Sequence, residues 1–168
     1  NRNPYAVIAL GGYGRGEQCV FSDVDLLLLF DKAVPDEAEQ LVQEYVYPLW
    51  DLGLDVGYAI RSLRECIKMA KEDLEVLTAV LDARFLCGIS SVYGELTTQV
   101  REKVLSRAPH KIIRSLVDRN RKRHDHYGDS AFLLEPNLKE GAGGLRDYHT
   151  MRWAGRIRFD LKELRDLE

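Results

Sequence analysis

Apolar and polar positions follow two different patterns along the chain, and they predict strands first and helices later. Near the N-terminus, three short and nearly continuous apolar runs cover residues 5–10, 24–30 and 54–60. Runs of this length are typical of strands that are buried on both faces of a sheet. The sequence therefore predicts three strands within the first 61 residues.

A helical period replaces this pattern between the second and third runs and again after the third. Residues 35–53 carry apolar side chains at i, i+3, i+4 and i+7, and Gly53 is placed to end that helix. Ser62 and Glu65 form a capping box, which opens a mostly helical second half with further helices at 92–105 and 109–126. We therefore expect an α/β (α+β) fold.

Domain organisation follows from the same change of pattern. We expect an α/β core over residues 1–61 and a helical extension over residues 62–168 that packs on it. Because no stretch rich in Pro, Gly or Ser separates the two parts, one compact body is expected rather than two independent domains.

Composition narrows the possible partners. The 168 residues carry a net charge of -3, which gives no electrostatic case for nucleic acid, and no apolar run is long enough to span a bilayer. The three cysteines are Cys19, Cys66 and Cys87, an odd number without zinc-binding spacing. Their usage is typical of a reducing compartment, so we expect a cytoplasmic protein with neither a membrane nor a nucleic-acid partner.

The most informative stretch joins a glycine-rich turn to a pair of acidic residues. Asp23 and Asp25 open the second apolar run, and residues i and i+2 of a strand share one face. Two carboxylates held that close repel each other unless a cation lies between them, and Mg²⁺ is the usual cation where phosphates complete its shell. Backbone N–H groups around Gly11 and Gly12 are suited to hold those phosphates.

This stretch resembles the nucleotidyltransferase superfamily of the polymerase-β type. The superfamily pattern is an apolar residue followed by two small ones, then a spacer and an acidic–apolar–acidic strand, which here are residues 10–12 and 23–25. A Walker A loop is excluded because Glu17 occupies the position of its lysine, and a dinucleotide-binding register fails at the same residue. The resemblance implies a small mixed sheet with flanking helices.

A third carboxylate is expected beside the acidic pair. Asp55 lies at the start of the third strand, in the context where the superfamily has an acidic residue that completes the metal shell or deprotonates the attacking hydroxyl. Asp51 is the alternative, but it lies at a helix end outside the strand. Asp23, Asp25 and Asp55 are therefore our candidates for both catalysis and metal binding.

A second polar loop, residues 133–147, adds candidates for nucleotide binding. Lys139 offers a point charge to phosphate, and Asn137 is able to read a base or ribose edge or to bind metal through its carbonyl. The same loop closes on an Arg-Asp pair, Arg146 and Asp147, at the start of a helix. A helix-entry loop without a ligand is the other interpretation.

Further candidates come from single polar and basic side chains. Arg15 in the glycine-rich turn and Ser22 before the acidic pair are also predicted to contact the nucleotide. The helix at 109–126 carries six Lys and Arg residues, which we interpret as a solvent-exposed face. In an alternative interpretation, Arg121 or Arg123 faces the triphosphate.

Taken in order, three blocks of sequence resemble the bacterial PII uridylyltransferase/uridylyl-removing enzymes. They are residues 11–17, residues 22–29 and residues 135–147, and residues 50–58 lie where that family has its third-carboxylate strand. One departure is Ala142, where the family often has proline, and it removes no ligand. The family's hydrolase and ligand-sensing domains are missing from these 168 residues, so we expect a fragment of a larger protein.

The resemblance implies a Mg²⁺-dependent transfer of UMP from UTP to a tyrosine of the PII signal protein, with release of pyrophosphate. Two alternatives remain open. The same fold would serve a nucleotidyltransferase with another protein or small-molecule acceptor, and a nucleotide-binding regulatory module would need no turnover. An RNA nucleotide-adding enzyme fits less well, because it would need a basic face.

Overall fold

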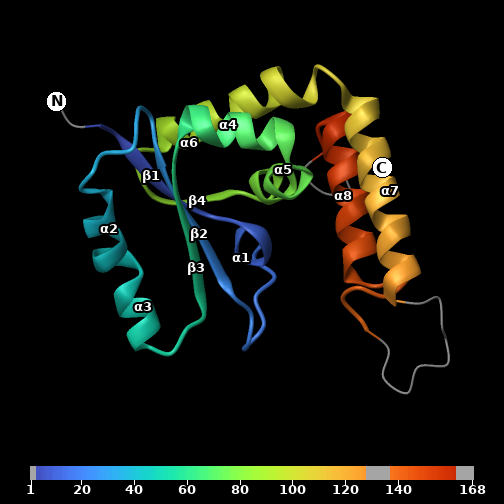
Figure 1. Cartoon of the computed structure of the whole chain (residues 1–168), viewed down its shortest axis with the longest axis horizontal. Helices are drawn as coiled ribbons and strands as arrows, with labels where there is room; N and C mark the ends of the chain where they lie inside the picture. Colours follow the sequence, from blue (N-terminus) through green and yellow to red (C-terminus); the bar gives the residue numbers. More distant parts are fainter. Residues whose placement is uncertain (1–2, 128–136, 162–168) are drawn as a thin grey trace. The chain divides into compact units, whose positions relative to one another are not determined.

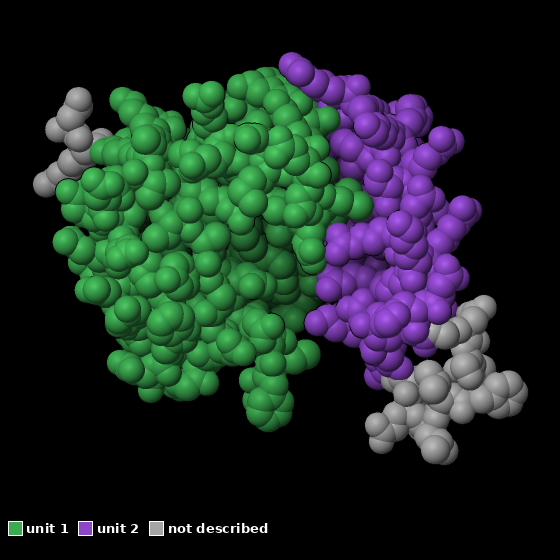
Figure 2. All heavy atoms as spheres, viewed as in Figure 1, with its two compact units in different colours: residues 1–104 green, residues 105–168 purple. Residues whose placement is uncertain are grey.

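The computed structural model describes residues 3–127 and 137–161. The chain forms two compact units, residues 1–104 and residues 105–168, which are coloured separately in Figure 2. The sequence pattern predicts a boundary near residue 61, and its prediction of one compact body stays a prediction.

Unit 1 is built on a four-stranded mixed sheet (Figure 1). Its strands are β1 Tyr5–Ala9, β2 Val24–Phe30, β3 Val56–Ser62 and β4 Arg84–Gly88. Their order across the sheet is β3-β2-β1-β4. Strand β1 is antiparallel to both β2 and β4, whereas β2 and β3 are parallel. The predicted α/β fold with a small mixed sheet is confirmed.

Six α-helices complete the part of unit 1 that the structure describes, and one π-helical turn crosses the boundary to unit 2. They are α1 Gly11–Arg15, α2 Ala38–Tyr45, α3 Tyr47–Asp51, α4 Leu63–Glu72, α5 Leu74–Leu81, α6 Ser90–Val100 and η1 Arg101–Leu105. Figure 1 shows α2 and α3 on one side of the sheet and α4 and α6 on the other.

Alternation along the strands explains this layering. Val42 and Val46 pack on Leu26 and Val56, so even-numbered positions of β2 face α2. Leu27 and its neighbours on the opposite face are fully buried as well. Because both faces are covered, β2 reads as an uninterrupted apolar run.

Local chemistry explains where α1 ends and why one predicted helix is divided. The first helix ends at Arg15 because Gly16 adopts a left-handed conformation with φ 74°. The single helix expected over 35–53 is divided into α2 and α3, since Pro48 has no N–H for a continuous helix and instead lies at the start of α3. Strand β3 begins two residues later than expected, at Val56.

Strand pairing explains why unit 1 extends to residue 104. Residues 84–88, which the helical period covers, form β4 and pair with β1 from Ala6 to Ala9. That pairing makes residues 62–104 part of the sheet-containing unit. The capping box at Ser62 is confirmed, with the Glu65 N–H donating to Ser62 Oγ at 3.2 Å.

In its described residues, unit 2 has two packed helices, α7 Pro109–Tyr127 and α8 Leu145–Phe159. Leu116 on α7 and Trp153 and Ile157 on α8 are buried. The helix predicted at 109–126 and the helix start near Arg146 are confirmed. In the ranges that the structure describes, no helix combines the length and apolar character needed to cross a membrane.

Candidate active site

Backbone register brings the chain at the three predicted carboxylates to one edge of the sheet. Asp25 pairs with Gly57, and Val24 pairs with Val56. The N–H of Val24 donates to the carbonyl oxygen of Asp55 at 2.8 Å. Continuing this register sets Asp23 opposite Asp55, immediately before the first paired residues. Paired positions share a face, so this register is consistent with three carboxylates on one side, and their meeting there stays a prediction.

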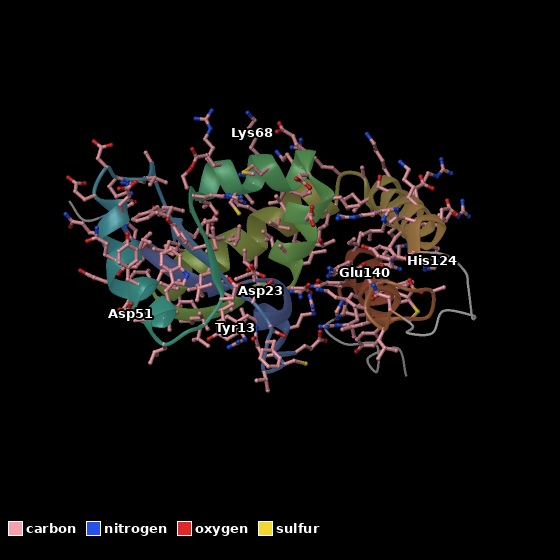
Figure 3. The ribbon with its side chains drawn as sticks, turned by 60° about the horizontal axis from the view of Figure 1, so that its bottom comes forward. Tyr13, Asp23, Asp51, Lys68, His124 and Glu140 are labelled. Carbon is pink, nitrogen blue, oxygen red and sulfur yellow. The ribbon has the colours of Figure 1, made fainter. Side chains whose placement is uncertain are left out.

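The alternative carboxylate, Asp51, is not part of this register. It is the last residue of α3, and Figure 3 shows it well apart from Asp23. Asp55 lies one residue before β3, and its carbonyl is hydrogen-bonded to β2. The geometry therefore supports Asp55 over Asp51 as the third acidic residue.

Two glycines flank the carboxylate of Asp25. A Cβ atom added at Gly11 would lie 2.9 Å from Asp25 Oδ2, and one added at Gly57 would lie 3.1 Å from Asp25 Oδ1. Both distances are shorter than ordinary van der Waals contacts, and Gly11 also has a φ of +52°. The glycine-rich turn and β3 thus leave room for this carboxylate between them.

Gly57 was not among the residues singled out from the sequence. A signal for it exists, because Gly57 is two residues after Asp55 and therefore shares its face of the strand. Glycine in a strand often marks the close approach of another group. Here that group is Asp25.

The site is open to a ligand. Asp23, Asp25 and Asp55 are exposed, and Gly11 and Gly12 are half-buried. Because Gly11 begins α1, its N–H group and that of Gly12 have no acceptor within the helix. Such N–H groups are suited to bind phosphate oxygens.

The donor chemistry fits Mg²⁺, which prefers carboxylate oxygens. However, within residues 3–127 and 137–161 no three His, Cys, Asp or Glu side chains form a cluster that could hold a metal ion. The magnesium site therefore stays a prediction, and its support is the backbone register of the three carboxylates.

Arg15 is engaged inside unit 1. Its Nη1 donates to Asp82 Oδ2 at 2.6 Å and its Nε to Glu17 Oε2 at 2.6 Å. The side chains of Arg15 and Asp82 are only 8% and 4% exposed. Burial alone would lower the pKa of Arg15, but the hydrogen bonds and charges of Glu17 and Asp82 outweigh it and raise that pKa. Arg15 thus anchors α1 to the end of α5, and its contact with a nucleotide stays a prediction.

The packing of α1 on this segment also explains why residue 14 of the turn is a glycine. A Cβ atom at Gly14 would lie 2.2 Å from the backbone oxygen of Asp82, so α1 packs directly on that segment. Arg84 also donates to the carbonyl oxygen of Tyr13 at 2.7 Å. Both partners are about 70 residues away in sequence, which is why the sequence pattern did not indicate them.

Ser22 closes a turn just before the acidic pair. Its Oγ accepts the N–H of Cys19 at 3.0 Å, and its own N–H donates to the carbonyl oxygen of Cys19 at 3.0 Å. Gln18 Nε2 donates to the carbonyl oxygen of Asp23 at 3.1 Å. The hydroxyl of Ser22 thus orders the entry into β2, and its nucleotide contact stays a prediction.

The second candidate loop lies in unit 2, where the structure describes it from Asn137 onward; residues 133–136 are outside the described residues. Asn137 Oδ1 accepts the N–H groups of Lys139 at 3.1 Å and Glu140 at 2.9 Å. The amide oxygen of Asn137 therefore forms a turn, and the side chain of Lys139 is exposed. Their predicted contact with the nucleotide stays untested.

Asp147 ties this loop to α7. It accepts the N–H of Gly143 at 2.6 Å, contacts His124 Nε2 at 2.9 Å, and forms an ion pair with Arg123. Burial would raise the pKa of Asp147, but these hydrogen bonds and the Arg123 charge lower it to about 2. Arg123 is only 10% exposed, so its guanidinium is part of unit 2 rather than of a solvent-exposed basic face.

Comparison with known proteins defines the class of this domain. The family described as Nucleotidyltransferase domain matches residues 1–109, and the family described as GlnD PII-uridylyltransferase matches residues 111–168. The chain belongs to the nucleotidyltransferase domain family. Its resemblance to the bacterial PII uridylyltransferase/uridylyl-removing enzymes is confirmed.

Two relatives of this chain are named bifunctional uridylyltransferase/uridylyl-removing enzyme. The protein from Rhodospirillum rubrum is 43% identical over 161 residues, and that from Azospirillum brasilense is 42% identical over 164 residues. These alignments cover 96% and 97% of this chain but 17% and 18% of the relatives. The chain thus spans less than a fifth of the length of these relatives.

Among solved structures, a chain titled "Crystal structure of the toxin-antitoxin with AMP-PNP" has a TM-score of 0.37 and 17% identity. The match covers 75% of this chain and 85% of that one. A similarity this weak supports no statement about the site.

Proposed function

We propose that this chain transfers UMP from UTP to a tyrosine hydroxyl of the PII signal protein and releases pyrophosphate, within a longer nitrogen-regulatory enzyme. The names of the relatives support uridylyl transfer, and the description of the family that matches residues 111–168 supports PII as the acceptor. The observation that carries the proposal is the register of Asp23, Asp25 and Asp55 beside the glycine turn, with the Asp25 carboxylate between Gly11 and Gly57.

Each group of this site has a role in the proposed reaction. Mg²⁺ held by the three carboxylates would neutralise the triphosphate and the departing pyrophosphate. The N–H groups of Gly11 and Gly12 bind phosphate oxygens. Asp55 accepts the proton of the attacking tyrosine hydroxyl. The hydroxyl oxygen then bonds to the α-phosphorus while the bond from that phosphorus to pyrophosphate breaks.

We also propose a cytoplasmic location for the protein. Its three cysteines, Cys19, Cys66 and Cys87, are free thiols, as expected in a reducing compartment. The acceptor and UTP would be met in the same compartment.

The proposal is tested by supplying the full-length protein with α-labelled UTP, Mg²⁺ and PII. Label should appear on wild-type PII and not on a PII variant whose acceptor tyrosine is replaced by phenylalanine. Parallel reactions with the other nucleoside triphosphates measure the base preference. Nucleotide binding without pyrophosphate release would instead support a regulatory module, and label on a different acceptor would identify another nucleotidyltransferase.

A further inference from the structure

Strand β3 forms one edge of the four-stranded sheet, with β2 as its neighbour. The hydrogen bond from the Val24 N–H to the Asp55 carbonyl oxygen shows which backbone groups face β2. Because successive residues of a strand direct their N–H and C=O groups to opposite sides, those of Val56, Tyr58 and Ile60 point away from the sheet. The outer edge of β3 is therefore a row of backbone donors and acceptors that β2 does not use.

Side chains cover both ends of this outer edge and leave its middle open. At one end, Trp50 Nε1 donates to the Val56 carbonyl oxygen at 3.1 Å, and at the other the Ser62 N–H donates to Glu65 Oε2 at 2.9 Å. Within the part of the chain that the structure describes, no hydrogen bond engages the backbone groups of the two outward-facing residues between these ends. The edge is thus available to another strand over a short length.

One face of this edge carries an exposed row of aromatic rings. Trp50 lies between Tyr47 and Tyr58, with ring centroids 5.4 and 6.1 Å apart, and all three rings are exposed. The hydrogen bond of Trp50 Nε1 to β3 holds the middle ring in place. Tyr58 pairs with Leu26, which packs against α2, so the aromatic row lies on the α2 face of the sheet. Exposed aromatic side chains are typical of protein-binding surfaces.

The other face of β3 is open beside the candidate active site. Gly57 lies on this face, because a Cβ atom there would approach the Asp25 carboxylate. Apart from its own chain neighbours, that Cβ atom would meet no other residue within 4 Å. The next residue on this face, Ala59, has only a methyl group as its side chain. A large side chain of an added strand would therefore have room here, next to Asp25.

These features together favour an extended protein segment over a nucleotide. The outward N–H and C=O groups of β3 are matched by the backbone of another strand, which a nucleotide does not have. A nucleotide at the Asp25 carboxylate would also be separated from the aromatic row, because the row lies on the opposite face. In an added strand, alternate side chains would reach the two faces. The acceptor protein of the proposed reaction has to bring its hydroxyl to this same edge.

We propose that an extended segment of the acceptor protein adds to the outer edge of β3 through backbone hydrogen bonds with Tyr58 and Ile60. Its tyrosine occupies the space over Gly57 and Ala59, on the face of the Asp25 carboxylate. The residues before and after that tyrosine point to the opposite face and cover the aromatic row. This inference rests on the proposed function, since it names the surface that binds the acceptor of that reaction.

Hydrogen exchange tests the edge of β3 directly. Amide exchange of the full-length protein is followed by mass spectrometry in peptic fragments that cover residues 56–62, with and without unmodified PII and without UTP. PII should slow the exchange of the Tyr58 and Ile60 amides, because both would become hydrogen-bonded. Fragments that cover β4, the other edge of the sheet, are the control and should exchange at the same rate in both samples.

Substitutions of Tyr58 separate its backbone from its side chain. Tyr58→Ala removes the ring and keeps the N–H, whereas Tyr58→Pro removes both at an edge position where proline is tolerated. The Kd for PII should be about tenfold higher for Tyr58→Pro than for Tyr58→Ala, because a hydrogen bond of the added strand is lost. Ile89→Ala shortens a similarly exposed apolar side chain outside this surface and should bind PII as the unchanged protein does. All three variants should keep the Kd for UTP, and thermal unfolding checks that each is folded.

Several results would overturn the proposal. One is a protein that labels PII while PII leaves the exchange of Tyr58 and Ile60 unchanged, and another is equal PII binding by the two Tyr58 variants. Slow exchange before PII is added would assign the edge to another part of the full-length protein. Protection that grows with the concentration of the enzyme alone would assign it to a second copy, and a raised Kd for UTP in Tyr58→Ala would assign the aromatic row to the nucleotide. Failure of the proposed function is seen separately, as an unchanged protein that does not label PII.

Discussion

At the scale of single residues, the site depends on two glycines as much as on its carboxylates. The carboxylate of Asp25 occupies the space that a Cβ atom at Gly11 or Gly57 would need. Neither glycine has a side chain that could take part in the reaction. Their contribution is to let a charged group of β2 approach both the phosphate-binding turn and the neighbouring strand.

Gly57→Ala should therefore reduce activity far more than stability. The added methyl group would lie 3.1 Å from Asp25 Oδ1 and displace the carboxylate by a few tenths of an ångström. We expect the initial rate of UMP transfer to fall about tenfold or more, equivalent to ~1.4 kcal/mol in the activation free energy. The free energy of unfolding, measured with urea, should change by less than ~1 kcal/mol because residue 57 is exposed.

Gly94→Ala is the matched control for this substitution. Gly94 lies within α6, and an added Cβ atom would meet nothing within 4 Å. Alanine is the better helix former, so the free energy of unfolding should rise by about 0.5–1 kcal/mol with the transfer rate unchanged. Full transfer activity in Gly57→Ala would contradict the assigned position of Asp25.

The buried ion pair of Arg15 gives a second residue-scale prediction. Asp82→Ala would leave the Arg15 guanidinium with one carboxylate fewer in a site where both partners are nearly inaccessible. We expect a loss of about 3 kcal/mol in the free energy of unfolding, measured by urea denaturation. The double variant Arg15→Met/Asp82→Leu should lose less, because no buried charge remains.

Nucleotide affinity separates the two roles considered for Arg15. If Arg15 mainly anchors α1, Asp82→Ala and Arg15→Met should lower stability by similar amounts and leave the KM for UTP within about twofold. A large rise in KM for Arg15→Met alone would assign the guanidinium to nucleotide binding.

At the scale of elements, periodicity predicted what is local and missed what depends on distant partners. The strands β1, β2 and β3 and the helix α7 follow from apolar runs and helical spacing. Strand β4 was not predicted, since it is a half-exposed edge strand whose partner is about 80 residues earlier. Strand formation there is decided by pairing with β1, which a local pattern does not contain.

In the candidate site, too, local features could be predicted from the sequence and contacts between separate elements could not. The shared face of Asp23 and Asp25 follows from the two-residue period of a strand, and the register with Asp55 agrees with the expected neighbouring strand. The engagement of Arg15 by Asp82 and of Arg123 by Asp147 could not be predicted, because each pair joins separate elements. Basic residues in a sequence are thus ambiguous between ligand binding and internal ion pairs.

The loop–helix junction of unit 2 should lose stability in acid. The pKa of Asp147 is lowered to about 2 from an unfolded value near 4, so its contribution is fully present above about pH 4. That contribution is lost as the pH falls from about 4 to about 2, and it is on the order of 2 kcal/mol. In a Trp50→Phe background, the fluorescence of Trp153 on α8 reports unfolding of unit 2 by urea at each pH.

Asp147→Asn is the control for this acid dependence. It should be less stable than the parent at neutral pH and should lack the additional loss between about pH 4 and pH 2. Identical pH profiles for the two proteins would show that Asp147 is not the group responsible.

At the scale of the whole molecule, structural units and family matches divide the chain at nearly the same place. The units meet between residues 104 and 105, and the two family matches meet between residues 109 and 111. Residues 1–104 contain the whole sheet and its covering helices. Expressed alone, they should give a well-dispersed amide NMR spectrum that overlays that of the full chain, except near the new C-terminus. A collapsed spectrum would show that unit 1 requires unit 2 to fold.

The central claim is that Asp23, Asp25 and Asp55 bind Mg²⁺, and that this ion contacts a triphosphate bound by the N–H groups of the glycine-rich turn. The most direct measurement is Mg²⁺-dependent pyrophosphate release from UTP in the presence of PII, comparing the unchanged protein with Asp25→Asn and Asp51→Asn. We predict that Asp25→Asn lowers the rate about a hundredfold or more at an unchanged Tm, whereas Asp51→Asn retains it. A rate in Asp25→Asn equal to that of the unchanged protein would contradict the account.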